Sequence, residues 1–359
     1  MKKTDNRYRL LLCGRAAALV PRVPRRRFTP WFSRYRFVLL VVSIAATSPA
    51  LAADDPRWAF SLLLGGHLPD LQPLNEGLFR SPFTGEATIL VREGGTGGVT
   101  GNTGDGATVD QNDVETFGYR FENPLPSVGL GAKVGLEFQW QPNDRHGFIF
   151  GFGSWEKTAI NRVTGNFPLQ QHFASNVINS ERRGAISYTE YTLGWRYNLL
   201  KSDKFRLYSR LSVNEVFDID YREDFVFYVA ESQIEDLPGI RRDMVVTAQT
   251  AALFMGQIGI GGEWFLRDWF SLGLEGGYMI GQSSFMLRDV QVYDDFVSGD
   301  SLSRTGMPFR RMSDGTLGYL LESATYQDLQ DPTTRESYYR SMRLGFDGWT
   351  FNFRLNFYF

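Results

Sequence analysis

The last eleven residues of the chain, 349–359, alternate between large apolar and polar side chains. Successive side chains of a β-strand point to opposite faces, so this alternation predicts a strand with one apolar and one polar face. In a bilayer, lipid would cover the apolar face while the polar face looked into a barrel lumen. The apolar set is Trp349, Phe351, Phe353, Leu355, Phe357 and Phe359. The segment therefore predicts a membrane-spanning strand of a β-barrel.

The amino-terminal region has the pattern of a secretory signal peptide. Residues 1–36 carry many basic groups and one acid, an apolar run follows over 37–46, and small residues predominate over 48–53. A basic region, an apolar core of about 7–15 residues and a small-residue cleavage site define such a signal. The apolar run is too short for a spanning helix, which needs about 20 residues. We expect residues 1–52 to be a signal peptide and residues 53–359 to be an outer-membrane β-barrel domain.

Three other interpretations of the leader stay open. Residues 25–28 loosely resemble a twin-arginine signal, residues 10–13 resemble a lipoprotein box ending at Cys13, and the length allows for a start site placed too early. The twin-arginine route exports folded proteins, whereas a barrel must reach the outer membrane unfolded. No apolar core precedes Cys13. We therefore expect export by the general secretory route, with cleavage after Ala52 or a neighbour.

Charge and cysteine content exclude several classes of function. The chain has 38 basic and 40 acidic residues, and the first 52 residues hold eleven and one of these, which leaves 27 and 39. A net charge of about −12 argues against nucleic acid as a partner. The single cysteine, Cys13, lies in the leader, so we expect no disulfide, thiolate metal site or cysteine catalysis. We expect no cofactor and no metal.

The remaining chain predicts eight strands joined by connections that are alternately long and short. The short connections, at 141–145, 200–203 and 266–268, are rich in turn-forming residues. Long loops on one side and short turns on the other are typical of an up-and-down barrel with extracellular loops and periplasmic turns. A soluble β-sandwich is the alternative, although it would not need this regular asymmetry. The expected strands are 57–66, 127–140, 146–157, 185–199, 204–217, 250–265, 268–281 and 349–359.

Seven tryptophans fall where such a barrel would cross the membrane interfaces. Amphipathic rings concentrate at those interfaces as girdles. We expect five at the periplasmic rim, namely Trp58, Trp140, Trp195, Trp264 and Trp269. We expect Trp155 and Trp349 at the opposite rim.

The polar positions of the strands predict an interior lined by charges of both signs. An eight-stranded barrel has an interior just wide enough for side chains to fill. Mixed charges there favour a salt-bridged plug, since an unpaired buried charge is strongly unfavourable. A narrow polar pore stays open as the alternative, because many glycines also face inward. The expected lumen charge network is Lys133, Glu137, Glu190, Arg196, Arg206, Arg210, Glu263, Glu275 and Arg354. On the strand at 127–140, Val128, Leu130, Val134, Leu136 and Phe138 should face lipid.

Together, the leader, the strand rhythm and the terminal Phe359 make the chain resemble the small eight-stranded outer-membrane barrels, the group of outer-membrane proteins A, X and W. The resemblance rests on architecture rather than on a motif. It implies that Phe357 and Phe359 form an assembly signal for the barrel-assembly machinery, reached with periplasmic chaperones. It also implies outer-membrane lipid and lipopolysaccharide as surroundings. No extracellular ligand follows from it.

The expected loops offer candidates for function. Residues 94–115 are rich in Gly, Asp and Asn, and the side-chain oxygens of Asp and Asn could hold calcium. Because neither an EF-hand pattern nor a repeated glycine–aspartate pattern is present, a flexible loop tip is favoured. In the third long connection, at 218–249, residues 224–229 and 242–247 are expected to prolong the neighbouring strands. In the fourth, at 282–348, residues 284–288 and 338–343 could do the same. Projecting strands with aromatic side chains suit a binding surface.

Catalysis is the least favoured interpretation. Some small barrels modify lipids with a His and a Ser at the outer rim, and the expected mature chain holds three histidines. His67 with Asp70, or His172 with Ser175, could approach that rim, whereas His146 falls in a periplasmic turn. No nucleophile motif frames any of them. We expect an integral barrel that is not an enzyme, with a structural or surface-recognition role.

Overall fold

The structure is a computed structural model, and its description covers part of the chain. The described residues are 58–71, 74, 75, 77, 80–90, 114–121, 124–166, 177–229, 240–281, 285–297, 302–306 and 308–359. The expected leader, the Gly/Asp-rich segment at 94–113 and His172 with Ser175 lie outside them. No helix within the described ranges is long and apolar enough to cross a membrane.

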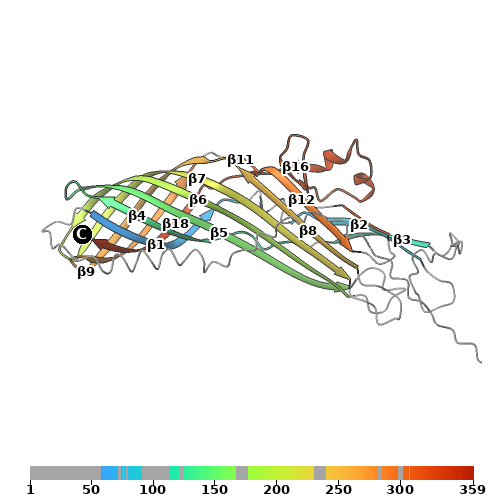
Figure 1. Cartoon of the computed structure of the whole chain (residues 1–359), viewed down its shortest axis with the longest axis horizontal. Coiled ribbons are helices and arrows are strands. Elements are labelled where there is room, and N and C mark those ends of the chain that lie inside the picture. The colour runs from blue at the N-terminus through green and yellow to red at the C-terminus, as the bar shows by residue number, and fades with distance from the viewer. Residues whose placement is uncertain are drawn as a thin grey trace, which may run out of the picture. The chain divides into compact units, whose positions relative to one another are not determined.

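Eight antiparallel strands close into a barrel (Figure 1). They pair in chain order, and the ring closes because β1 pairs with both β4 and β18. The strands are β1 (Trp58–Pro69), β4 (Gly131–Trp140), β5 (His146–Asn166), β6 (Val177–Lys201), β7 (Phe205–Val229), β9 (Leu253–Arg267), β10 (Phe270–Ile280) and β18 (Gly348–Tyr358). The predicted all-β, eight-stranded antiparallel barrel is confirmed. Closure gives every strand two neighbours, so the ring has no open edge.

The short connections lie at one end of the barrel, here called the turn end. They join β4 to β5, β6 to β7 and β9 to β10, as the turn-forming residues predicted. The strand register places the start of β1 and the end of β18 there too, since Trp58 pairs with Trp140 and Ala59 pairs with Tyr358. The opposite end is called the loop end.

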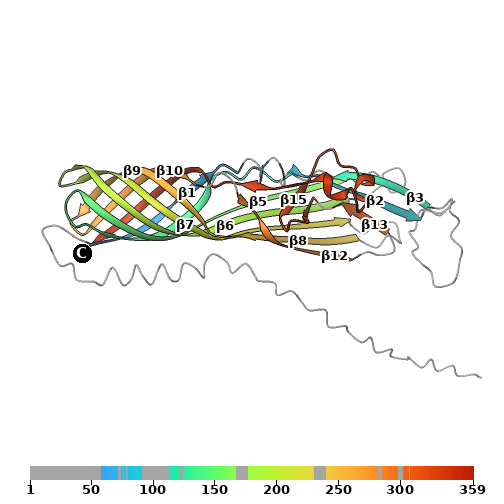
Figure 2. The same ribbon diagram turned by 90° about the horizontal axis from the view of Figure 1, so that it is seen from above.

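Three barrel strands run far past the loop end of β1, β4 and β18. β5 has 21 residues, and β6 and β7 have 25 each. Beyond the barrel, β7 pairs with β8 (Ile240–Thr250), and β8 pairs with β12 (Arg288–Val297). The outer parts of β5, β6 and β7, together with β8 and β12, form what we call the extended sheet (Figure 2). The predicted strand character of residues 224–229 and 242–247 is confirmed.

One residue marks the point where β7 changes partners. Residues 205–216 of β7 pair with β9, and residues 219–229 pair with β8. Between them, Asp218 has a positive φ of 49°. Aspartate enters this left-handed region more readily than most residues because its short polar side chain bonds locally. The extra residues shift the alternation, so Val216 and Ile219 are both buried.

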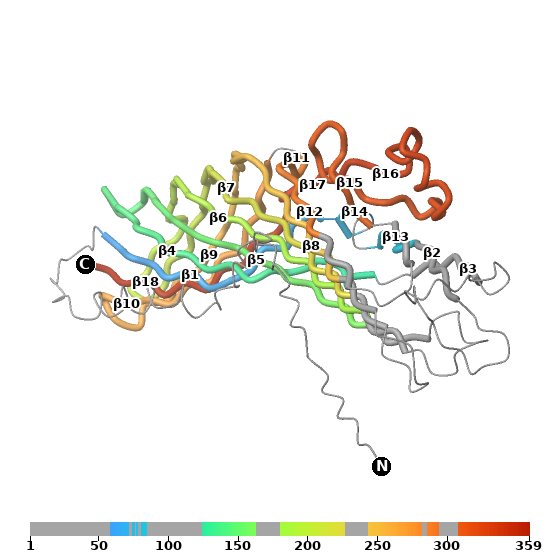
Figure 3. The backbone as a smooth tube through the Cα atoms, turned by 45° about the vertical axis from the view of Figure 1, so that its right-hand side comes forward, coloured from blue at the N-terminus to red at the C-terminus, as the bar shows by residue number. Residues whose placement is uncertain are grey.

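Shorter strands from the two longest connections complete this end. They are β2 (Phe83–Leu90), β3 (Val114–Phe121), β11 (Phe285–Met286), β13 (Leu302–Gly306), β14 (Phe309–Arg311), β15 (Leu317–Leu320), β16 (Tyr339–Ser341) and β17 (Arg343–Leu344), with 3-10 helices η4 (Gln327–Leu329) and η5 (Arg335–Tyr338). β13, β2 and β3 form one small sheet, and β14, β15 and β16 form another. β14 lies against β12 (Figure 3). The expectation that 284–288 and 338–343 prolong barrel strands is wrong for the described residues. β11 pairs with β17 and β16 pairs with β15, all of them separate from β10 and β18.

These segments cover one face of the extended sheet and enclose an apolar core. Phe83 of β2 stacks on Phe225 of β7 with ring centroids 5.0 Å apart. Phe309 and Leu317 join the same buried cluster. From the sheet, the cluster takes Ile186, Tyr221, Phe225, Met244 and Val246. The extended sheet is therefore half of a layered structure with its own core.

Candidate functional site: the barrel interior

The structure places the nine predicted charged residues inside the barrel. Each is at most 7% exposed. They come from every barrel strand except β1 and β5, at positions that alternate with outward apolar residues. The residues are Lys133, Glu137, Glu190, Arg196, Arg206, Arg210, Glu263, Glu275 and Arg354.

Four of these residues form a ring of ion pairs across the lumen. Arg210 Nη1 lies 2.7 Å from Glu137 Oε1 and 3.1 Å from Glu275 Oε1. Arg354 Nη1 lies 2.9 Å from Glu275 Oε2, and its Nη2 pairs with Glu137 Oε2. The four side chains come from β4, β7, β10 and β18, so the ring joins strands on different sides of the barrel. We call these four residues the central ring.

Two further pairs flank the central ring. Towards the loop end, Lys133 Nζ lies 2.5 Å from Glu190 Oε1. Towards the turn end, Arg196 Nη2 lies 2.6 Å from Glu263 Oε2, and Glu263 also accepts hydrogen bonds from Ser271, Asn356 and Tyr358. Buried charges are tolerated when they are both paired and hydrogen-bonded. Among the described residues, eight of the nine charged side chains have an ion-pair partner, and Arg206 donates a hydrogen bond to Gln141 Oε1 instead.

Aromatic side chains close the interior at the loop end of the polar network. His67 of β1 is fully buried, and its Nδ1 is 2.7 Å from the hydroxyl of Tyr188. Trp155 stacks on Tyr188 with centroids 5.2 Å apart and also contacts Phe346. Trp155, Tyr188 and Phe346 belong to the apolar core under the extended sheet. Along the axis, the polar network therefore gives way to tightly packed apolar side chains.

Six of the seven tryptophans lie on the outside of the barrel, and one prediction is wrong. Trp155 is 1% exposed, and its Nε1 donates a hydrogen bond to the carbonyl of His67. On β5, Phe148, Phe150 and Phe152 face outward, so residue 155 has the opposite parity and points inward. The outward tryptophans are Trp58, Trp140, Trp195, Trp264, Trp269 and Trp349.

Val128 is a second correction. It was expected to face lipid but is 4% exposed and belongs to the apolar core. β4 begins only at Gly131, so strand alternation does not extend to residue 128. The amide of Val128 instead donates a hydrogen bond to Asn75 Oδ1 at 2.7 Å.

The terminal phenylalanines lie at the turn end. Phe357 packs against Trp269 and Phe270 on the outer wall. Phe359 is half exposed, and its amide donates to the carbonyl of Trp58 at 3.1 Å. Both residues are thus placed where β18 meets β1 and the barrel closes. His146 lies at the same end, where Trp195 Nε1 donates to its Nδ1 at 3.1 Å.

The extended sheet contains its own buried ion pair. Arg182 Nε donates to Glu223 Oε1, and the Tyr221 hydroxyl donates to Glu223 Oε2 at 2.5 Å. Burial, followed by the charge of Glu223, raises the pKa of Tyr221 well above its usual value. This tyrosine is therefore neutral at physiological pH and acts as a hydrogen-bond donor.

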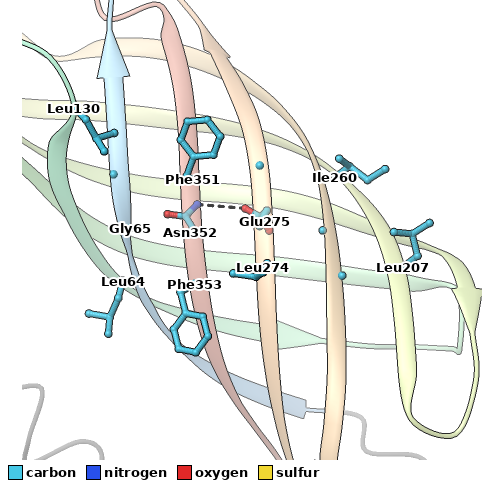
Figure 4. A pocket seen from close by; sticks show the side chains of 14 residues that line it. Leu64, Gly65, Leu130, Leu207, Ile260, Leu274, Glu275, Phe351, Asn352 and Phe353 are labelled. Atoms are coloured by element: carbon cyan, nitrogen blue, oxygen red, sulfur yellow. Dashed lines mark hydrogen bonds between the residues drawn. The ribbon is translucent and has the colours of Figure 1, made fainter.

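A groove of about 620 Å³ lies on the outer wall rather than in the interior (Figure 4). It is lined by Leu64, Leu274, Phe351 and Phe353, together with glycines that carry no side chain, such as Gly66 and Gly276. Asn352 and Glu275 bond to each other behind its floor. The groove presents no outward acid, base or nucleophile. Among the described residues, no group of His, Cys, Asp and Glu could hold a metal ion.

Comparisons with known proteins find matching solved structures but no family. No protein-family model matches the chain, and no curated protein matches it. CarO of Acinetobacter baumannii is 10% identical, with a TM-score of 0.27, over 78% of this chain and 98% of that one. The outer membrane protease OmpT of Escherichia coli is 9% identical, with a TM-score of 0.28, over 87% and 99%. The toluene transporter TodX of P. putida is 11% identical, with a TM-score of 0.19, over 86% and 91%.

Because these TM-scores are below 0.5, the barrel assignment rests on the strand pairing of this chain. The resemblance to outer-membrane proteins A, X and W stays a prediction.

Proposed function

We propose that the chain is an integral outer-membrane barrel whose extended sheet and covering segments have a structural or surface-recognition role. This proposal rests on a change in the outward-facing side chains along the same strands, from apolar within the barrel to charged in the extended sheet. On β5, Phe148, Phe150 and Phe152 face out within the barrel, whereas Arg162 faces out in the extended sheet. On β6, Leu193 is 64% exposed within the barrel, whereas Glu181 pairs with Arg162 beyond it.

An apolar outer wall is expected only where lipid replaces water. Soluble monomers rarely expose a large contiguous apolar surface, yet exposed apolar side chains surround this barrel. Examples on β7, β9, β10 and β18 are Val213, Ile258, Leu274 and Phe351. Five tryptophans at the turn end would form the girdle at one interface. Charged pairs on the outside of the extended sheet, such as Arg222 with Asp224, suit water beyond the other interface.

Biogenesis follows from this proposal. Residues 1–52 would direct export by the general secretory route, and periplasmic chaperones would carry the unfolded chain to the barrel-assembly machinery. Phe357 and Phe359, which close the barrel beside β1, would form the signal read there. Lipopolysaccharide and outer-membrane lipid would surround the wall.

The interior supports recognition rather than transport. The central ring fills the lumen with mutually paired charges, and the packed rings of Trp155, Tyr188 and Phe346, here called the Trp155 cluster, follow it towards the loop end. A narrow channel for small solutes is the second candidate, favoured by the polar lining of the interior. We propose no enzymatic role, since His67 is buried against Tyr188 and Trp155 rather than open at a rim.

Cysteine labelling tests the orientation. Leu193→Cys places a thiol on the barrel wall, and Arg162→Cys places one on the extended sheet. In intact cells, a membrane-impermeant maleimide should label the processed Arg162→Cys protein and leave Leu193→Cys unlabelled, because lipid covers position 193.

Denatured samples of both variants should label equally, which controls for thiol reactivity. Equal labelling of both positions in intact cells would mean that water reaches the barrel wall, and the membrane proposal would fail.

A further inference from the structure

One glycine on the outer wall has no role in the packing of the barrel itself. Gly276 of β10 faces outward, two positions after Leu274, which is 61% exposed. A Cβ atom added to Gly276 would meet no heavy atom within 4 Å beyond its chain neighbours, and its φ is not positive. A glycine inside a strand weakens the strand, and it often marks a place where a ligand or another backbone approaches closely.

Two other outward glycines of the same groove are explained by their neighbours. A Cβ atom at Gly66 would lie 2.6 Å from Leu130 Cδ1, and one at Gly262 would lie 3.2 Å from Phe205 Cε2. Side chains of the barrel therefore already cover these two glycines. The floor of the groove at Gly276 is open by contrast.

Apolar side chains surround this open floor. Phe351 of β18 and Ile260 of β9 flank Gly276 in register, and Leu274 and Phe353 occupy the next outward positions towards the turn end. Phe351 is 52% exposed and Ile260 is 54% exposed. Because the surrounding side chains carry no polar group, the groove suits a hydrocarbon chain.

The open floor lies next to the expected interface at the loop end. Tyr278 and Trp349 are one outward position nearer that end than Gly276 and Phe351, and their rings meet edge-on with centroids 5.1 Å apart. Adjacent outward positions on a strand are about 7 Å apart, and amphipathic rings concentrate at membrane interfaces. The floor therefore faces the leaflet on the loop-end side, which is the outer leaflet in the proposed orientation.

We propose that this groove binds an acyl chain of lipopolysaccharide, seated over Gly276 between Phe351 and Ile260. An empty depression would cost the lining side chains their dispersion contacts. The lining comes from the neighbouring strands β1, β18, β10, β9 and β7, so the groove runs around the convex wall. A flexible acyl chain can follow that course, whereas the convex wall of a second barrel cannot. The inference rests on the proposed function, because lipid reaches the groove only if the barrel spans the outer membrane.

Retention of lipopolysaccharide by the folded protein tests the proposal. The processed protein is refolded into phospholipid vesicles that contain lipopolysaccharide, extracted into mild detergent and weighed by native mass spectrometry. The native protein should keep a single lipopolysaccharide. Gly276→Phe places a ring in the open groove, so retention should fall about tenfold. Val213→Phe is the control, because it adds the same ring to the outer wall away from the groove, and it should retain the lipid.

Heat-modifiable migration on a gel verifies that each variant folds, and Gly276→Leu fills the groove if Gly276→Phe does not fold. A native protein that keeps no lipid, or keeps phospholipid instead, would overturn the proposal. So would equal retention by the native protein and the filled-groove variant. A two-chain mass that the filled-groove variant abolishes would assign the groove to a second copy. These results leave the membrane-spanning role intact, whereas labelling of Leu193→Cys in intact cells would refute that role as well.

Discussion

Replacing Arg354 with alanine should lower the free energy of unfolding by about 3–5 kcal/mol, which is the usual cost of removing one partner from a buried ion pair. Arg354 bridges Glu137 and Glu275 across the lumen. Without it, two buried carboxylates would share Arg210 alone. Urea unfolding of the protein in lipid vesicles, followed by tryptophan fluorescence, measures the loss.

Arg162→Ala is the matched control. Arg162 also pairs with a glutamate, Glu181, but the two side chains are 75% and 44% exposed. Exposed pairs contribute about 0–1 kcal/mol, so this variant should be nearly neutral. If Arg354→Ala were no worse than Arg162→Ala, the central ring would not stabilise the barrel.

Trp155→Ala should cost about 3–5 kcal/mol, the range found for removing a large buried aromatic side chain. Trp155 contacts His67, Tyr188 and Phe346, and it also donates a hydrogen bond to the carbonyl of His67. Its removal leaves a cavity where the polar network meets the apolar core. The same unfolding experiment measures the effect.

Trp349→Ala provides the comparison. Trp349 is 55% exposed on the outer wall and has Tyr278 as an edge-on neighbour. Its loss removes interfacial burial without opening a cavity, so the destabilisation should be smaller than that of Trp155→Ala. Equal effects would indicate that both rings lie at an interface, as the sequence first suggested.

The contrast between these tryptophans shows how much the sequence could predict. Strand number, the three short turns and the inward face of each barrel strand follow from a period of two and from turn chemistry. Trp155 was within reach of the same rule, because it lies an odd number of positions from the outward Phe148, Phe150 and Phe152 on its strand. Its position near the end of the expected strand 146–157 suggested the rim of the barrel, whereas strand alternation alone predicts an inward side chain.

Other features depend on contacts that no local pattern encodes. Alternation placed Glu275 inside, but its pairing with both Arg210 and Arg354 depends on the register of four strands. The extended sheet was visible as strand-like residues 224–229, whereas the cover formed by Phe83 on Phe225 joins residues 142 positions apart. Asp218 gave no signal in the sequence that β7 would change partners there.

The most direct test of this account is the conductance of the processed protein in a planar bilayer, with insertion verified by heat-modifiable migration on a gel. A silent bilayer is expected, because the central ring and the Trp155 cluster together fill the interior. Reproducible discrete conductance steps would contradict it. They would make Lys133, Glu137, Arg206, Arg210 and Glu275 the lining of a narrow channel.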